Sequence, residues 1–195
     1  MITDTAAVRG AALDAVAAQR VYRSALEALS RPGTVHPLPP SGYPAALLPV
    51  LALADLDTGT HLVDLPGDAW EPIVEVATGA PVVEVHAARY VTVLDPAAAA
   101  DAVAHAHPGS AASPESGATV VIAVESVVGG DPVLLTGPGV AGELLFAPRG
   151  VDPAIWTIRE GRVADFPAGI DLLFVDPDGG IVGVPRTTTA TTTTR

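Results

Sequence analysis

Hydrophobic positions repeat with a helical period near the start of the chain. Tyr22, Leu26 and Leu29 follow an i, i+4, i+7 pattern, which places them on one face of a helix predicted over 13–30. Pro32 and Gly33 then interrupt the pattern and end this helix. Further helices are predicted over 45–54, 69–77, 96–105 and a segment that begins after Asp152 and Pro153.

Short runs of apolar and β-branched residues predict strands between these helices. Residues 118–124 are apolar throughout, which is typical of a central strand covered on both faces. The other predicted strands cover 34–38, 61–65, 88–94, 133–136, 143–147, 170–175 and 181–184. The Asp-Pro-Asp-Gly sequence at 176–179 predicts a type I turn, and a second close hairpin is predicted at 129–132. The chain is therefore expected to be an α/β protein with one mixed β-sheet flanked by helices.

Length and composition fit a single domain. The chain has 195 residues, of which 49% are hydrophobic, enough for a sizeable core. The threonine-rich segment 189–195 is of low complexity. We expect one domain over 1–188, followed by a frayed tail over 189–195.

The charge balance excludes several classes of partner. The chain carries 22 acidic and 10 basic residues, a net charge of −12, which disfavours binding to nucleic acid or to an anionic membrane. The longest apolar run, 43–54, is too short to span a bilayer and contains Pro44 and Pro49. The first residues do not resemble a signal peptide, so a cytoplasmic location is expected.

Two missing residue types limit the chemistry. All ten basic residues are arginine, so no lysine can form a Schiff base with pyridoxal phosphate. There is no cysteine for a disulfide or an iron–sulfur cluster. His105 and His107 are the only close histidine pair, and a solvated helix end is the preferred interpretation over a metal site. We expect this chain to bind no metal and no cofactor.

Arg186 is the first candidate for a binding residue. It precedes Thr187 and Thr188, and a guanidinium beside hydroxyl groups suits a phosphate or phosphonate. An equally good interpretation is that Arg186 pairs with one of the many carboxylates of the chain.

Two further groups are candidate ligand-binding residues. Thr136, Gly137 and Gly139 belong to a turn whose backbone N–H groups can approach an anion closely, although a turn that merely ends a strand is favoured. Asp55 and Asp57 form a possible carboxylate pair, against a simpler role in ending a helix.

Several blocks of sequence, taken together, resemble the PhnH subunit of carbon–phosphorus lyase. They lie in family order at 22–33 (YRSALEALSRPG), 53–58 (LADLDT), 113–119 (SPESGAT), 135–140 (LTGPGV), 166–171 (FPAGID) and 185–188 (PRTT). Tyr22 stands where the family usually has phenylalanine, and the threonine run after Thr188 matches nothing in it.

The resemblance implies a fold related to that of the pyridoxal-phosphate-dependent transferases, without the cofactor. It implies a homodimer in isolation and, in the cell, a core complex with other carbon–phosphorus lyase subunits. That complex couples an alkylphosphonate to the ribose of ATP, releasing adenine and forming a ribose 1-phosphonate 5-triphosphate. The subunit alone is expected to be inactive, and the family supplies no catalytic residue to transfer. The alternatives from the residues are a stand-alone binding protein for a small anion, nucleotide or phosphonate, and a purely structural dimer scaffold.

Overall fold

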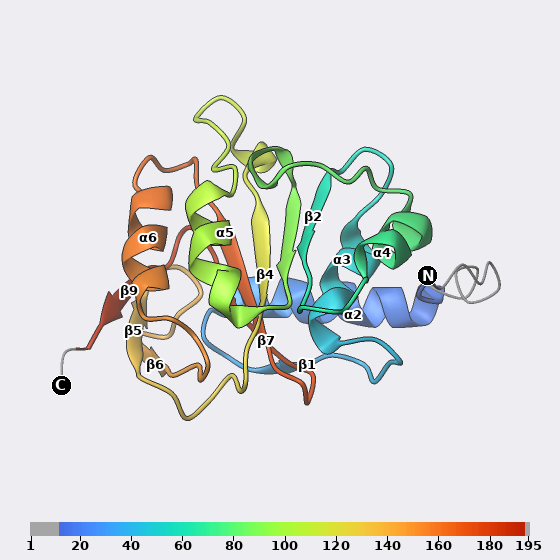
Figure 1. Ribbon diagram of the computed structural model, residues 1–195. Coiled ribbons are helices and arrows are strands. Elements are labelled where there is room, and N and C mark those ends of the chain that lie inside the picture. Colours follow the sequence, from blue (N-terminus) through green and yellow to red (C-terminus); the bar gives the residue numbers. More distant parts are fainter. Residues whose placement is uncertain (1–11, 194–195) are drawn as a thin grey trace.

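A six-stranded mixed β-sheet runs through the centre of the protein (Figure 1). The computed structural model describes residues 12–193. The strand order in this sheet is β1-β8-β7-β4-β3-β2. The strands are β1 (His36–Pro37), β2 (Thr60–Val63), β3 (Tyr90–Val93), β4 (Thr119–Ala123), β7 (Asp171–Val175) and β8 (Gly180–Val184).

The sheet is parallel in its middle and antiparallel at one side. Strands β2, β3, β4 and β7 pair in parallel, whereas β8 pairs antiparallel with β7 and β1 pairs antiparallel with β8. The predicted α/β class and mixed sheet are confirmed. The turn at 176–179 is also confirmed: the Gly179 amide donates to the Asp176 carbonyl at 3.0 Å, and the turn joins β7 to β8. Gly179 has a φ of +84°, a conformation that glycine adopts without strain.

Helices cover both faces of the sheet. Helices α2 (Ala15–Ser30), α3 (Leu48–Leu53) and α4 (Glu71–Thr78) share one core with Val121 and Leu173 of the sheet. Helices α5 (Ala99–His105) and α6 (Ala154–Arg162) share the opposite core with Val120, Ile122 and Leu172 (Figure 1). Neighbouring residues of β4 and β7 thus enter different cores, which explains why these strands are apolar on both faces.

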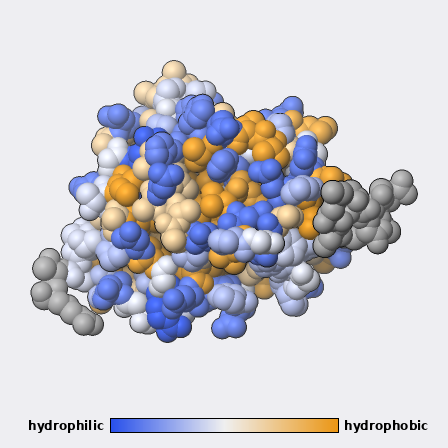
Figure 2. All heavy atoms as spheres, viewed as in Figure 1, coloured by the Kyte–Doolittle hydropathy of each residue, from blue (hydrophilic) through white to orange (hydrophobic). Residues whose placement is uncertain are grey.

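Short 3-10 segments complete the helical elements: η1 (Ala45–Leu47), η2 (Val85–Ala87), η3 (Pro96–Ala98) and η4 (Pro114–Ser116). The helices predicted over 45–54 and 96–105 each begin as one of these 3-10 turns. Within residues 12–193, no helix is long and apolar enough to cross a bilayer. On the face that carries α5 and α6, hydrophobic residues are interspersed among polar ones, with several near its centre (Figure 2).

Helix α2 lies on the sheet by a different face from the one predicted. Tyr22 and Leu26 are 52% and 53% exposed, whereas Val21, Ala25 and Ala28 are buried. The reason is the closeness of α2 to β8. A Cβ placed on Gly183 would lie only 2.5 Å from the Ala28 carbonyl oxygen, so small side chains are needed on the inner face. The prediction of the helix is confirmed, but the face that carries Tyr22 and Leu26 is not the one that packs on the sheet.

A second sheet departs from the prediction. Strands β5 (Val133–Thr136), β6 (Leu144–Phe146) and β9 (Thr189–Thr192) form an antiparallel sheet in the order β6-β5-β9. The predicted hairpin at 129–132 is wrong, because the chain leaves the central sheet after β4 and starts this second one. The prediction of a frayed tail is wrong for Thr189–Thr192, because these residues supply the strand that satisfies the free edge of β5. A likeness to pyridoxal-phosphate-dependent transferases stays a prediction.

Candidate functional site

Four arginines gather where the parallel strands begin. Arg89 directly precedes β3, and Arg186 follows β8, whose end pairs with the start of β7. Arg159 and Arg162 come from the last turns of α6. We call the region that holds these four arginines the amino edge, because the parallel strands of the sheet begin there.

Arg186 is held by Asp171, the first residue of β7. Its Nη2 lies 2.6 Å from Oδ2 of Asp171, and its Nε lies 3.2 Å from both carboxylate oxygens. Its backbone N–H donates to the same carboxylate at 2.8 Å, and Nη1 donates to the Pro114 carbonyl at 2.6 Å. The two side chains are only 13% and 16% exposed. Pairing of Arg186 with a carboxylate is confirmed, and anion binding by Arg186 stays a prediction.

Thr187 and Thr188 face in different directions. Thr187 is exposed, whereas Thr188 is 2% exposed and its buried hydroxyl has no hydrogen-bond partner among the described residues. The Thr188 amide donates to the Pro185 carbonyl at 2.9 Å, which closes a tight turn after β8. The Thr188 hydroxyl is thus directed into the protein, and only Thr187 is open to a ligand from solvent.

The turn at 136–139 meets this segment from the second sheet. Thr136 pairs with Thr189, and a Cβ on Gly137 would lie 2.9 Å from the Thr187 carbonyl oxygen. A Cβ on Gly139 would lie 2.3 Å from the Ser30 carbonyl oxygen at the end of α2. The structure therefore brings the 136–139 and 187–188 candidates together. The glycines allow close approach to the protein's own backbone, as a strand-ending turn requires.

Asp55 and Asp57 occupy the turn between α3 and β2. Oδ1 of Asp55 accepts hydrogen bonds from the Asp57 amide at 3.0 Å and from the Thr58 hydroxyl at 2.9 Å. This is an Asx turn, in which the carboxylate replaces a backbone acceptor. The role of ending a helix and turning the chain is confirmed for Asp55. Ligand binding by this pair remains a prediction.

Arg159 is a residue that the sequence reasoning missed. It is 2% exposed, and its Nη2 donates to the carbonyls of Pro185 at 2.7 Å and Thr188 at 3.0 Å. Burial lowers the pKa of Arg159 to about 10, while the nearby Asp171 carboxylate opposes that shift. The sequence does contain a signal for the burial of Arg159. This residue lies four positions after Ile155, which places both on the buried face of the helix.

Arg162 and Arg89 also bind backbone carbonyls. Arg162 donates to Ala106, and Arg89 donates to Gly117. A hollow of about 370 Å³ lies between the 108–111 loop and α6, with Arg162 and Asp165 in its wall. The Nε of Arg162 is buried and has no hydrogen-bond partner within residues 12–193.

The arginines of the amino edge fix the loops around them. Their backbone acceptors lie in segments 106–117 and 185–188, which include parts of two sequence blocks of the PhnH resemblance. His105 is exposed and its Nδ1 lies 3.3 Å from an Asp101 carboxylate oxygen, as expected for a solvated helix end. Among the described residues, no three His, Asp or Glu side chains are placed to hold a metal ion. Most of the arginine donors of this edge are thus already used in hydrogen bonds inside the protein.

Comparison with known proteins identifies the family. The family model described as bacterial phosphonate metabolism protein (PhnH) matches residues 9–191. A putative C-P lyase subunit protein HtxG from Stutzerimonas stutzeri is 36% identical over 179 residues, which cover 87% of this chain and 84% of that protein. The alpha-D-ribose 1-methylphosphonate 5-triphosphate synthase subunit PhnH of Rhizobium meliloti (strain 1021) is 29% identical over 178 residues, 88% of each chain. This chain therefore belongs to the PhnH family of bacterial phosphonate metabolism proteins.

Proposed function

We propose that this chain is a subunit of the carbon–phosphorus lyase core complex in the bacterial cytoplasm. Within that complex it serves the coupling of an alkylphosphonate to the ribose of ATP, which releases adenine and forms a ribose 1-phosphonate 5-triphosphate. The observation that carries the proposal is the similarity to a synthase subunit over 88% of both chains. A shared length of this extent supports a common fold and, with it, the proposal of a common assembly.

The amino edge favours a positioning role in this complex. Arg186 and Arg159 donate to one carboxylate and to three backbone carbonyls of the chain itself. A fixed loop loses less conformational entropy when it contacts a partner. The segments at 106–117 and 185–188 are therefore suited to present a defined surface to other subunits, or to a second copy of this chain in a homodimer.

Binding of a small anion by the isolated chain is the second candidate function. It is favoured by the hollow beside Arg162, whose Nε has no partner in the described structure. A phosphonate bound in this hollow would give the buried Nε of Arg162 a hydrogen-bond acceptor. At Arg186, by contrast, an anion would have to displace Asp171. A purely structural dimer scaffold is the third candidate.

Co-purification tests the assembly proposal. The tagged chain is expressed together with the other core subunits of its own organism and purified under native conditions. We expect a stable complex, and we expect a strain lacking the chain to lose growth on methylphosphonate as its phosphorus source. The proposal would be refuted if the strain lacking the chain grew on methylphosphonate, or if the tagged chain were purified without the other subunits.

Calorimetry on the isolated chain tests the anion candidate. ATP, methylphosphonate and ribose 5-phosphate are titrated into the wild type and into Arg162→Gln. Saturable binding that Arg162→Gln weakens at least tenfold would favour the stand-alone binding protein. No heat of binding with any of the three would leave assembly as the better account.

A further inference from the structure

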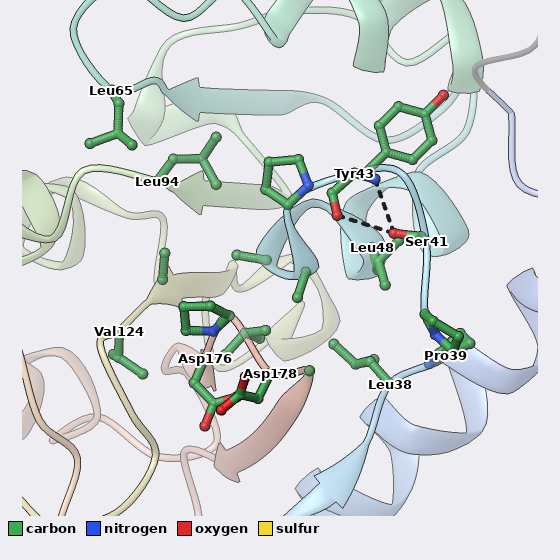
Figure 3. A pocket seen from close by; sticks show the side chains of 18 of the residues that line it. Leu38, Pro39, Ser41, Tyr43, Leu48, Leu65, Leu94, Val124, Asp176 and Asp178 are labelled. Carbon is green, nitrogen blue, oxygen red and sulfur yellow. Dashed lines mark hydrogen bonds between the residues drawn. The ribbon is translucent and has the colours of Figure 1, made fainter.

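A cavity of about 490 Å³ lies at the carboxyl ends of β4 and β7, at the end of the central sheet opposite to the amino edge (Figure 3). In sheets of this kind, ligands bind beyond the carboxyl ends of the parallel strands. The loop that enters η1 closes the cavity from one side, and the β7–β8 turn closes it from another. The volume falls within the range of about 300–1,000 Å³ typical of small-molecule pockets.

The walls of this cavity are apolar over most of their surface. Leu38 and Pro39 come from the loop before η1, and Leu94 and Val124 follow the ends of β3 and β4. Figure 3 shows Leu94 across the cavity from the carboxylates of the β7–β8 turn. Such walls suit a hydrocarbon stem or ring.

The charged groups of the wall all have the same sign. They are Asp68, Asp176 and Asp178, and among residues 12–193 no arginine or histidine lines the cavity. The chain has no lysine that could reach in. An anionic ligand would meet three carboxylates without a compensating cation, whereas a cation would be attracted by all three.

Asp176 is fixed in place by the fold. It is 8% exposed, and its two carboxylate oxygens accept hydrogen bonds from the Gly180 amide at 2.8 Å and the Val127 amide at 3.2 Å. Each oxygen has a second lone pair for a further donor. Among the described residues, no arginine or histidine forms an ion pair with Asp176. Asp176 is therefore a preorganised carboxylate without a cationic partner in the described part of the chain, and it is one of the residues of the cavity wall.

The loop on the other side of the cavity is held by hydrogen bonds of its own. The Ser41 hydroxyl accepts from the Tyr43 amide and donates to the Tyr43 carbonyl, both at 3.1 Å (Figure 3). The ring of Tyr43 packs edge-on against Trp70, with centroids 6.2 Å apart. A ligand in the cavity would contact Tyr43 and, through it, change the surroundings of Trp70.

We propose that this cavity binds a small organic cation, an ammonium or guanidinium group carried on an apolar stem. The stem packs against the leucine, proline and valine side chains. The cation lies at the β7–β8 turn and donates to Asp178 and Asp176. This site lies at the end of the sheet opposite to the amino edge. Its proposal is independent of the proposed function, so either can be refuted without the other.

The probe is n-hexylammonium, with 1-hexanol as its uncharged counterpart and hexanoate as its anionic one. Binding is followed in the 15N–1H spectrum of the whole chain through the amides of Val127 and Gly180, which donate to Asp176. Trp70 fluorescence in a Trp156→Phe background gives a second readout, since the chain has two tryptophans. We expect a saturable shift with n-hexylammonium, about tenfold weaker binding of hexanol, and none of hexanoate.

Asp178→Asn tests the contribution of charge without disturbing the turn. Asn suits the same turn position. We expect this variant to weaken n-hexylammonium binding by about two- to fivefold, within the range for one exposed ion pair. Asp131→Asn, an exposed aspartate before β5, is the matched control and is expected to change nothing. Equal binding of hexanol and n-hexylammonium, no effect of Asp178→Asn, or no saturable shift of the two amides would each overturn the proposal.

Discussion

Replacing Arg186 by methionine removes a guanidinium that holds together the start of β7, the turn after β8 and the loop at Pro114. The side chains of Arg186 and Asp171 are 13% and 16% exposed, so the substitution leaves a largely buried carboxylate without its cation. Breaking such a pair costs about 3–5 kcal/mol of folding free energy. Asp171 keeps one donor, the Arg186 amide at 2.8 Å, so we expect a loss near the lower end, about 3 kcal/mol.

Urea unfolding followed by circular dichroism measures this loss. A double-mutant cycle with Asp171→Asn then isolates the interaction of the two side chains. We expect the double variant to be more stable than the sum of the single losses predicts, with a coupling of about 1–3 kcal/mol. Arg31→Met is the matched control. Its pair with Glu27 spans 3.5 Å between side chains 65% and 40% exposed, and such pairs contribute about 0–1 kcal/mol.

Two results would refute this reasoning. One is a stability of Arg186→Met within about 1 kcal/mol of the wild type, which is below the cost expected for a buried pair. The other is a coupling near zero. If Arg186→Met instead removed binding of methylphosphonate without lowering stability, Arg186 would be a ligand-binding residue and not a structural one.

Two further substitutions and one truncation test the packing around this edge by urea unfolding. Gly139→Ala places a Cβ 2.3 Å from the Ser30 carbonyl oxygen at a φ of +82°, and we expect it to lower the free energy of unfolding by about 2–4 kcal/mol. The control Gly142→Ala has a similar φ of +79° but open space around it, so it should lower that free energy by only about 1–2 kcal/mol. Equal losses at the two glycines would contradict the close approach to α2. Ending the chain at Thr188 removes β9 and should lower stability by about 1–3 kcal/mol and speed hydrogen exchange of the β5 amides; unchanged exchange would argue against the β5–β9 pairing. Arg159→Met leaves two carbonyls without their donor and should cost about 2–4 kcal/mol, and a neutral result would mean that burying the charge offsets those hydrogen bonds.

The candidate site was only partly predictable from the sequence. Arg186 was identified by its neighbours, but its partner Asp171 lies 15 residues earlier in the chain. Only the antiparallel pairing of β7 with β8 brings the two together. Arg159 was missed because a charged residue is ordinarily expected at the surface. Its acceptors are carbonyls in a distant turn, and no local pattern indicates them.

The sequence by itself determined the order and type of most elements. Local signals suffice for these: the apolar run of 118–124 for β4, and the Asp-Pro-Asp-Gly turn between β7 and β8. It also excluded lysine and cysteine chemistry, since those residues are absent.

Only the tertiary structure decided which faces meet. It buried Val21 of α2 in place of Tyr22, because the contact with Gly183 leaves room only for small side chains between helix and sheet. It turned the threonine run into β9, because the edge of β5 offers unpaired backbone groups. It also placed an arginine-rich edge and an apolar cavity with three aspartates in its wall at opposite ends of one sheet. Such an arrangement depends on contacts between residues far apart in the chain, which spacing along the sequence does not encode.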